Sequence, residues 1–267
     1  MPPELDASAA PPQFPSSLLD ALRQARHVLV FTGAGVSAES GIPTFREALK
    51  GLWERFDPRE LATPEAFQRD PALVWGWYEW RRMQIRHAEP NPGHRAIATL
   101  ARHVAQLALV TQNVDDLHER AGSTVIAHLH GQISKPICFN CGLPTFHPED
   151  RPEEPEGGRR LEPPRCGTCG GAIRPGVVWF GEPLPTEDWS HAMEAARSAD
   201  LVISVGTSNL VYPAAEIPEL AARRGATLIL VNPAATAMDP IARYTLQGPA
   251  GVILPALVAA AFPSLGA

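Results

Sequence analysis

The stretch HVLVFTGAG, residues 27–35, decides the fold class of this chain. An apolar run of strand length leads directly into a turn with two glycines, which is typical of a buried strand in a parallel sheet. The pattern recurs in VAQLALVTQNVD (104–115), ADLVISVGTSN (199–209) and ATLILVNPA (226–234). GVILPAL (251–257) is predicted to be the last strand, followed by an apolar helix.

Helical segments alternate with these strands, among them LLDALRQA (18–25) and residues 95–103. Strands that alternate with helices predict an α/β fold, in which a parallel sheet is covered by helices on both faces. Ligands of such sheets bind at the carboxyl ends of the strands, where the polar residues of these stretches fall.

Two stretches interrupt the alternation and predict a second lobe. Residues 46–94 are rich in tryptophan and contain no convincing strand, and residues 136–172 contain all four cysteines. We expect both to form a small lobe beside a sheet domain that is built from residues 16–45, 95–135 and 173–267.

The composition fits a protein with a substantial core and argues against some partners. The chain has 267 residues, of which 45% are hydrophobic and 19% charged, with a net charge of -6. An acidic chain is poorly suited to nucleic acid or an anionic membrane, and it weakly favours a cationic partner such as a lysine-rich polypeptide. Residues 1–15 are expected to be a disordered tail without the features of a signal or transit peptide. No apolar stretch reaches the ~18 residues that cross a bilayer, so we expect a cytoplasmic protein.

The segment GAGVSA (33–38) matches G-x-G-x-x-G/A directly after a predicted strand. Glycines there let the backbone approach a pyrophosphate, but an ordinary tight turn has the same pattern. A dehydrogenase would also need a second strand that ends in Asp or Glu about 20 residues further on. That position falls in GLWERFD, which is not a strand. The motif therefore favours a nucleotide site or a plain turn over hydride transfer.

The four cysteines stand as two C-x-x-C pairs, Cys138 with Cys141 and Cys166 with Cys169. Four thiolates complete a tetrahedral zinc shell and leave no position open for water, so the pattern predicts a structural zinc site. Disulfides and free thiols are the alternatives. Clustering in a protein expected to be cytoplasmic disfavours disulfides.

Polar residues at two strand ends are further candidates. His128 and His130 lie in AHLHGQ, before a glycine that allows a tight turn. Gln112, Asn113 and Asp115 follow a predicted strand, where they either cap the next helix or hold sugar hydroxyls or a carboxamide. A lone histidine is more often structural than catalytic, and this interpretation covers His87, His94, His103 and His118.

In VWGWYEWRRM (74–83) an arginine stands among aromatic residues. At about 100° per residue, Arg81 lies near the centre of an apolar helical face. That face holds Val74, Trp77, Tyr78 and Ile85, and the opposite face holds Glu79, Arg82 and Arg86. A guanidinium on an apolar face needs an anion, or it must reach water by extending its stem along the surface.

The motifs together resemble one known family. The run TGAGVSAESGIPTFR (32–46) is similar throughout to the first motif of the sirtuins, the NAD-dependent protein lysine deacylases. Six further motifs follow in the family's order, namely TQNVD (111–115), LHG (129–131), the two C-x-x-C pairs, VVWFGE (177–182), VGTSN (205–209) and VNP (231–233). The resemblance covers roughly residues 18–258.

The resemblance implies a large Rossmann-like NAD-binding domain with a small zinc-and-helix lobe. NAD and acyl-lysine would enter the cleft from opposite sides. The phosphates would be lined by Gly33, Ala34, Gly35 and Ser37. The nicotinamide carboxamide would be held by Ile42, Asn113 and Asp115, with Gln112 on ribose hydroxyls, Phe45 over the nicotinamide ribose and Arg46 closing over the cofactor. The adenosine half would be held by Gly206, Thr207, Ser208, Asn232 and Ala250.

The resemblance also implies the chemistry, with His130 and Asn113 as the catalytic residues. Nicotinamide would leave, the acyl oxygen of the substrate lysine would capture the ribose, and His130 would remove a proton from a ribose hydroxyl. A reference pKa near neutral suits a histidine to that task. Water would then release lysine and an O-acyl-ADP-ribose. The segment VVWFGE, with Val177 and Phe180, would pair with the substrate peptide as a strand.

Tyr78 and Arg81 match the Tyr-x-x-Arg of class III sirtuins, and Ala62 in LATPEAF matches the small residue that widens their acyl pocket. The resemblance implies that both side chains bind the far carboxylate of a succinyl, malonyl or glutaryl group. The expected function is removal of succinyl and malonyl groups, and more weakly acetyl groups, from lysines of proteins or peptides. A plain deacetylase, a mono-ADP-ribosyltransferase and an NAD-sensing binding module are the alternatives.

Overall fold

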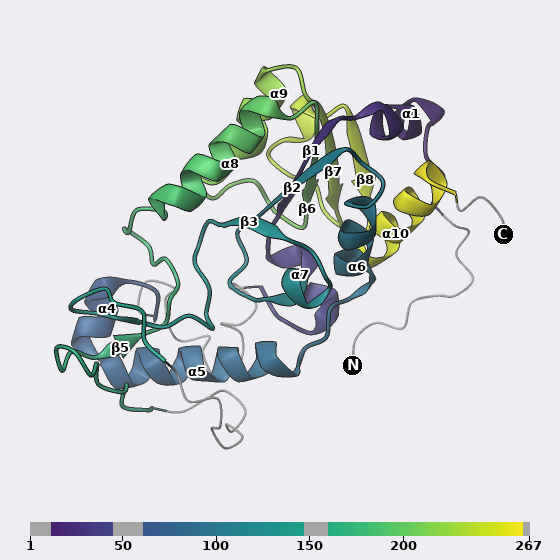
Figure 1. The fold of residues 1–267 in the computed structure, drawn as a ribbon. Helices are drawn as coiled ribbons and strands as arrows, with labels where there is room; N and C mark the ends of the chain where they lie inside the picture. Colours follow the sequence, from purple (N-terminus) through teal and green to yellow (C-terminus); the bar gives the residue numbers. More distant parts are fainter. Residues whose placement is uncertain (1–11, 45–60, 147–159, 264–267) are drawn as a thin grey trace.

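A computed structural model describes residues 12–44, 61–146 and 160–263 (Figure 1). Phe45 and Arg46 lie outside the described residues. So do residues 1–11 of the expected tail and most of the acidic loop between the two cysteine pairs.

The larger part of the structure is a six-stranded parallel sheet with the strand order β3-β2-β1-β6-β7-β8. Its strands are β1 (His27–Thr32), β2 (Gln106–Thr111), β3 (Val125–His128), β6 (Leu201–Val205), β7 (Thr227–Asn232) and β8 (Tyr244–Gln247). The chain builds outward from β1 to β3 and then resumes at β6 on the other side of β1. This reversal is that of a Rossmann fold, whose ligands bind at the carboxyl ends of the strands where the order reverses.

Helices cover both faces of the sheet, as Figure 1 shows. One layer consists of α1 (Ser16–Gln24), α6 (Pro92–Leu100) and α10 (Ala250–Ala261), and the other of α8 (Thr186–Ser198) and α9 (Glu216–Arg223). Successive side chains of a strand point to opposite faces. Val28 and Val30 of β1 accordingly share a core with the first layer, and Leu29 and Phe31 share one with the second. The predicted fold class is confirmed.

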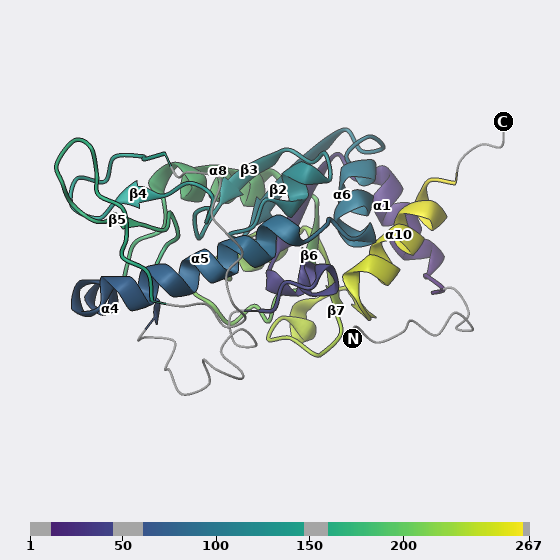
Figure 2. The ribbon, with the colours of Figure 1, turned by 90° about the horizontal axis from the view of Figure 1, so that it is seen from below.

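A small lobe lies beside the sheet (Figures 1 and 2). It contains α4 (Pro64–Arg69), α5 (Pro71–His87), and the antiparallel pair β4 (Ile137–Cys138) and β5 (Ile173–Arg174). Thr63 and Asp70 begin the two helices by accepting a hydrogen bond from the backbone N–H three residues further on. Phe67 and Trp77 share one hydrophobic core with Cys138, so the cysteine segment and the helices support each other.

The remaining elements are short and lie at the ends of sheet strands or between them. They are α7 (Leu117–Arg120) and the 3-10 turns η1 (Ala34–Val36), η2 (Ala38–Ser40) and η4 (Asp239–Ile241). Two of these turns follow β1 directly, so the first motif after Thr32 is compact rather than extended.

The stretch GVILPAL lies in helix α10, so its prediction as a strand is wrong. Periodicity does not distinguish a short, continuously apolar strand from a buried helix. Ile253, Leu254 and Leu257 of this stretch all enter the core of the first helix layer. The sheet ends instead at β8, which precedes the stretch.

Helix α5 is buried on both of its faces. Glu79 and Arg82, which share the predicted polar face, are 2% and 8% exposed and form an ion pair at 3.0 Å. A buried charge needs such a partner, and here the helix supplies both charges itself. None of the helices in the described ranges, α5 included, has both the length and the apolar character that a membrane span requires.

Candidate functional site

The glycine turn after β1 packs against the turn after β6, where the strand order reverses. The N–H of Gly35 donates to the carbonyl oxygen of Gly206 at 2.8 Å. A Cβ at Gly35 would lie 2.7 Å from that oxygen, and a Cβ at Gly33 would lie 2.7 Å from Cβ of Thr207. The two turns therefore approach this closely only because both positions are glycine.

The other residues predicted for the phosphates and the adenosine half lie at the same edge of the sheet or near it. Thr207 Oγ1 accepts a hydrogen bond from Nε2 of Gln112 at 3.1 Å, which joins the ends of β6 and β2. At the end of β7, Asn232 Nδ2 donates to the carbonyl oxygen of Ala234 at 2.7 Å. Ala34 and Ser208 are exposed, whereas Ala250 is buried at the start of α10.

A hydrogen-bond network joins the residues predicted for the nicotinamide end. Ser37 Oγ donates to Oδ2 of Asp115 at 3.0 Å and accepts from Nδ2 of Asn113 at 3.1 Å. Asp115 Oδ1 accepts from the N–H of Leu117 at 3.2 Å. Burial raises the pKa of Asp115, although these donors oppose the shift. Residues from two separate motifs thus form one buried polar cluster, with Ile42 buried in the adjoining small-lobe core.

Asn113 carries a buried acceptor with no partner. Within the part of the chain that the structure describes, its Oδ1 makes no hydrogen bond. Leaving a buried polar atom unpaired is costly, and a bound ligand that supplies an N–H donor removes the cost. The carboxamide of nicotinamide carries such a donor, so this atom fits the cofactor that the motifs imply.

Two neutral histidines lie behind the network. Nδ1 of His94 accepts from the N–H of Asn91 at 3.3 Å, which leaves its Nε2–H directed at Ser37 Oγ, 3.4 Å away. Nε2 of His118 lies 3.0 Å from Thr32 Oγ1. The ring centroids of His94 and His118 are 4.8 Å apart. Burial, aided by Arg95, lowers the pKa of His94 to about 4, and burial lowers that of His118 to about 3. Neither ring carries a charge at neutral pH.

His130 lies half-buried just after β3. Its Nδ1 is 3.0 Å from the carbonyl oxygen of Gln112. A carbonyl oxygen only accepts, so Nδ1 carries the hydrogen and Nε2 carries the lone pair. Burial lowers the pKa of His130, and the bond to Gln112 opposes the shift in part. At neutral pH the ring therefore presents an unprotonated Nε2, which suits a general base.

The segment VVWFGE runs between His130 and the small lobe. The N–H of Val178 donates to the carbonyl oxygen of His130 at 2.9 Å, and the N–H of Phe180 donates to that of Ala62, also at 2.9 Å. Val177 is buried, whereas Phe180 is 53% exposed. Phe180 thus offers open apolar surface on a segment that is hydrogen-bonded to both lobes.

Tyr78 and Arg81 lie one turn apart on α5 and are 5% and 8% exposed. Oη of Tyr78 accepts a hydrogen bond from Nε1 of Trp179 at 3.0 Å. The guanidinium of Arg81 lies 5.3 Å from the ring centroid of Trp77. Burial lowers the pKa of Arg81, while Tyr78 and Asp115 act in the other direction. Arg81 therefore sits in the electrostatic field of Asp115, a member of the buried polar cluster.

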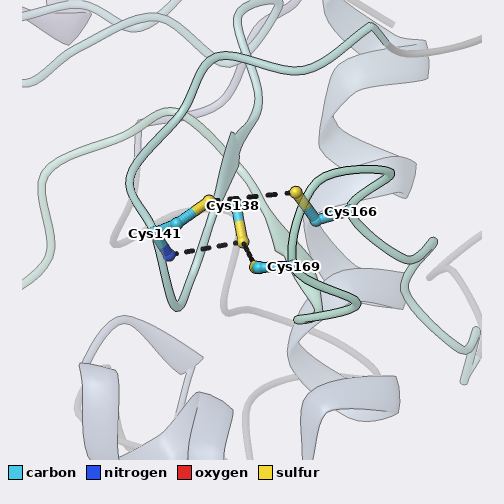
Figure 3. A group of neighbouring side chains, drawn as sticks. All are labelled: Cys138, Cys141, Cys166 and Cys169. Atoms are coloured by element: carbon cyan, nitrogen blue, oxygen red, sulfur yellow. Dashed lines mark hydrogen bonds between the residues drawn. The ribbon is translucent and has the colours of Figure 1, made fainter.

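The four cysteines converge from two segments of the small lobe, strand β4 with the turn after it and the loop before β5 (Figure 3). Their sulfur atoms all lie within 4.8 Å of one another, with Cys138 and Cys169 3.4 Å apart and Cys141 and Cys166 3.8 Å apart. A zinc ion about 2.3 Å from four sulfurs in a tetrahedron places them about 3.8 Å apart. Backbone N–H donors lower the pKa of Cys138 and Cys166, whereas the neighbouring sulfurs raise that of Cys169. The cluster fits zinc, and a shell of four thiolates makes the metal structural.

The sequence profile of the Sir2 family matches residues 33–213. This chain belongs to the Sir2, or sirtuin, family. It is 59% identical to the NAD-dependent protein deacylase of Methylococcus capsulatus over 93% of this chain and 97% of that protein. It is 56% identical to NAD-dependent protein deacylase 1 of Pseudomonas aeruginosa over 92% of this chain and 99% of that protein.

Solved sirtuin structures share the fold over almost the whole chain. A Sir2 homologue in complex with NAD is 44% identical, with a TM-score of 0.86 over 97% of this chain and 98% of that one. Sir2Af2 bound to a myristoylated histone peptide is 35% identical, with a TM-score of 0.71 over 92% and 95%.

Two buried or half-buried charged residues beside the VVWFGE segment, Arg174 and Glu182, are not predicted from the sequence as an ion pair. Arg174 is buried and donates to the carboxylate of Glu182, and its guanidinium lies 3.5 Å from the ring centroid of Trp179. The signal available for them is weak, since a lone arginine before the VVWFGE motif has no spacing that indicates a buried ion pair. Only the folded segment brings the two charges together.

Proposed function

We propose that this chain is an NAD-dependent protein-lysine deacylase that prefers succinyl and malonyl groups to acetyl groups. Close similarity to deacylases over more than 90% of both chains supports the activity. The observation that carries the acyl preference is the buried guanidinium of Arg81, one helical turn from Tyr78. The proposed substrates are acyl-lysine side chains of proteins or peptides.

NAD fits the edge of the sheet where the strand order reverses. In the proposed division of the chain, residues 16–45, 95–135 and 173–267 bind it, and the small lobe of residues 46–94 and 136–172 completes the cleft. The glycine turn lets the phosphates approach the backbone, which assigns them to Gly33, Ala34, Gly35 and Ser37. The adenosine half is assigned to Gly206, Thr207, Ser208, Asn232 and Ala250. The carboxamide donates to Oδ1 of Asn113, beside Ile42 and Asp115.

His130 acts as the general base in this proposal. NAD supplies the ribose carbon that the acyl oxygen of the substrate attacks as nicotinamide leaves. Nε2 of His130 accepts the proton of a ribose hydroxyl, and the carbonyl oxygen of Gln112 holds the ring in the required orientation. Asn113 and Asp115 bind the nicotinamide end and orient it. No cysteine takes part, because all four fit the structural zinc site.

Arg81 and Tyr78 are proposed to bind the carboxylate at the far end of the acyl group. Guanidinium is a donor only, and the Tyr78 hydroxyl has a hydrogen to donate. The small side chain of Ala62 leaves room in the acyl pocket. A hydrogen bond to a charged group contributes roughly 1.5–3 kcal/mol, which corresponds to about ten- to a hundredfold in kcat/KM. Acetyl-lysine lacks the carboxylate and is processed more slowly.

Steady-state kinetics with NAD on matched succinyl-lysine and acetyl-lysine peptides test the proposal. We expect the wild type to prefer the succinyl peptide, and Arg81→Met to lose that preference while it keeps activity on the acetyl peptide. Arg86→Met is the matched control, because Arg86 belongs to the same helix but is exposed. Its ratio of succinyl to acetyl activity should equal that of the wild type.

Other outcomes identify the alternatives. A wild type that prefers acetyl-lysine is a plain deacetylase. An Arg81→Met variant that loses both activities equally shows that the arginine is structural. Release of nicotinamide with ADP-ribose attached to the protein substrate, without loss of its acyl group, indicates a mono-ADP-ribosyltransferase.

A further inference from the structure

The side chain of Trp179 connects the VVWFGE segment to helix α5. It is 2% exposed, and its Nε1–H donates to Oη of Tyr78 at 3.0 Å. An indole N–H is a donor and never an acceptor. The oxygen of Tyr78 must therefore be the acceptor in this contact, so the hydroxyl hydrogen points away from Trp179.

Trp179 is held from three sides. The guanidinium of Arg174 lies 3.5 Å from its ring centroid, and the carboxylate of Glu182 accepts its backbone N–H at 2.8 Å. Arg174 also donates to Glu182, which closes the arrangement. Phe67 packs on the ring with a centroid distance of 5.4 Å. The indole N–H thus has a fixed direction, and its hydrogen bond to Oη of Tyr78 in turn fixes the orientation of the tyrosine hydroxyl.

The polarity of this end of the acyl pocket follows. Burial raises the pKa of Tyr78 to about 12, so its hydroxyl stays protonated. With one lone pair of its oxygen taken by Trp179, Tyr78 directs its O–H donor away from the indole. Arg81, one turn further along α5, is also a donor without acceptor capacity. A group with acceptors alone, such as a carboxylate, can accept a hydrogen bond from both side chains, whereas the methyl of an acetyl group can accept from neither.

We propose that Trp179 is a positioning residue for acyl selectivity, because its indole N–H fixes the Tyr78 hydroxyl as a donor toward the carboxylate of the acyl group. Trp179 acts through Tyr78 and does not itself bind the carboxylate. The inference rests on the proposed preference for acidic acyl groups. It adds to Tyr78 and Arg81 of α5 a residue from the VVWFGE segment.

The test is a double-mutant cycle of Trp179→Phe and Tyr78→Phe. Dissociation constants for succinyl-lysine and acetyl-lysine peptides are measured by calorimetry without NAD, and kcat/KM for both peptides with NAD. A neutral hydrogen bond corresponds to about two- to tenfold. We expect Trp179→Phe to lower the succinyl preference by that factor in both measurements, with little change for acetyl-lysine. In the Tyr78→Phe background the same substitution should have no further effect on the preference.

Phe67→Leu is the matched control, because it removes packing from the Trp179 ring without touching a hydrogen bond. It should lower the succinyl preference less than Trp179→Phe does, because the indole N–H and its bond to Tyr78 are kept. Should Trp179→Phe fail to fold, the isostere 3-benzothienylalanine at position 179 keeps the bicyclic ring and removes only the N–H. The same loss of preference is expected.

Two results overturn the inference in distinguishable ways. A wild type that prefers acetyl-lysine contradicts the proposed function, and the role of Trp179 fails with it. A wild type that prefers succinyl-lysine, together with a Trp179→Phe variant that keeps the preference or loses it additively with Tyr78→Phe, contradicts the role of Trp179 alone.

Discussion

Replacing Gly131 with alanine is predicted to separate the histidine loop from the segment it pairs with. Gly131 has a φ of +73°, and a Cβ there would lie 2.2 Å from the carbonyl oxygen of Gly176. Carbon–oxygen contacts normally lie near ~3.3 Å or beyond, so the two chains must part by about 1 Å. Two hydrogen bonds cross the contact, from Gln132 N–H to the Gly176 carbonyl at 2.8 Å and from Val178 N–H to that of His130 at 2.9 Å.

The expected cost has two parts. A left-handed backbone costs a residue with a Cβ roughly 1–2 kcal/mol. Loss of two hydrogen bonds adds roughly 0.5–1.5 kcal/mol each. The free energy of unfolding should therefore fall by about 2–5 kcal/mol. His130 precedes the substituted residue, and a 1 Å displacement of a reacting group costs about a hundredfold in rate. We expect kcat/KM on the succinyl peptide to fall by that order.

Urea denaturation and steady-state kinetics measure the two effects, and Gly122→Ala separates their causes. Gly122 has a φ of +91°, and a Cβ there would meet nothing within 4 Å. This control should lose only the backbone contribution of about 1–2 kcal/mol and keep its activity. Equal destabilisation of the two variants, or full activity in Gly131→Ala, would refute the claim that the contact with Gly176 holds the base in place.

Three further predictions concern protons and metal. The free energy of unfolding should fall as the pH drops from 6.5 toward 4. In the folded chain His94 and His118 have pKa values of about 4 and about 3 and stay neutral over this range, whereas both histidines bind protons in the unfolded chain. Two such groups make the free energy of unfolding change by up to about 2.7 kcal/mol per pH unit. If His118→Gln leaves this pH dependence unchanged, the assignment to buried neutral histidines is wrong. The midpoint of the acidic limb of the pH profile of kcat/KM should lie below the ordinary histidine pKa, since burial lowers the pKa of His130. A midpoint above that value would contradict the role of His130 as the base. Removal of zinc by a chelator should lower both Tm and activity, because Cys138 and Cys166 share a core with α5, and a metal-free protein with unchanged Tm would contradict a structural site.

The strands nearest the site were predictable because they are continuous apolar runs that end in small or polar residues. The runs that contain Leu29 and Ile203 are buried on both faces, which is what parallel strands between two helix layers require. The cysteine cluster was predictable for a similar reason, since the C-x-x-C spacing is a local property of the chain. The run around Ile253 has the same composition but forms a helix, because composition does not reveal whether a segment pairs with a strand or packs on the sheet.

Contacts between distant segments were not predictable, and α5 shows why this matters for the acyl pocket. The helix buries two neighbouring arginines in different ways. Arg82 pairs with Glu79 one turn earlier, so its charge is compensated within the helix. At the positions one turn before and after Arg81, the sequence offers Trp77, Tyr78, Gln84 and Ile85, none of them acidic. Charge compensation for Arg81 must therefore come from outside α5, where the field of Asp115 reaches it. A carboxylate on the acyl group can add a charge-assisted hydrogen bond to this guanidinium, which is the physical basis of the proposed preference for acidic acyl groups.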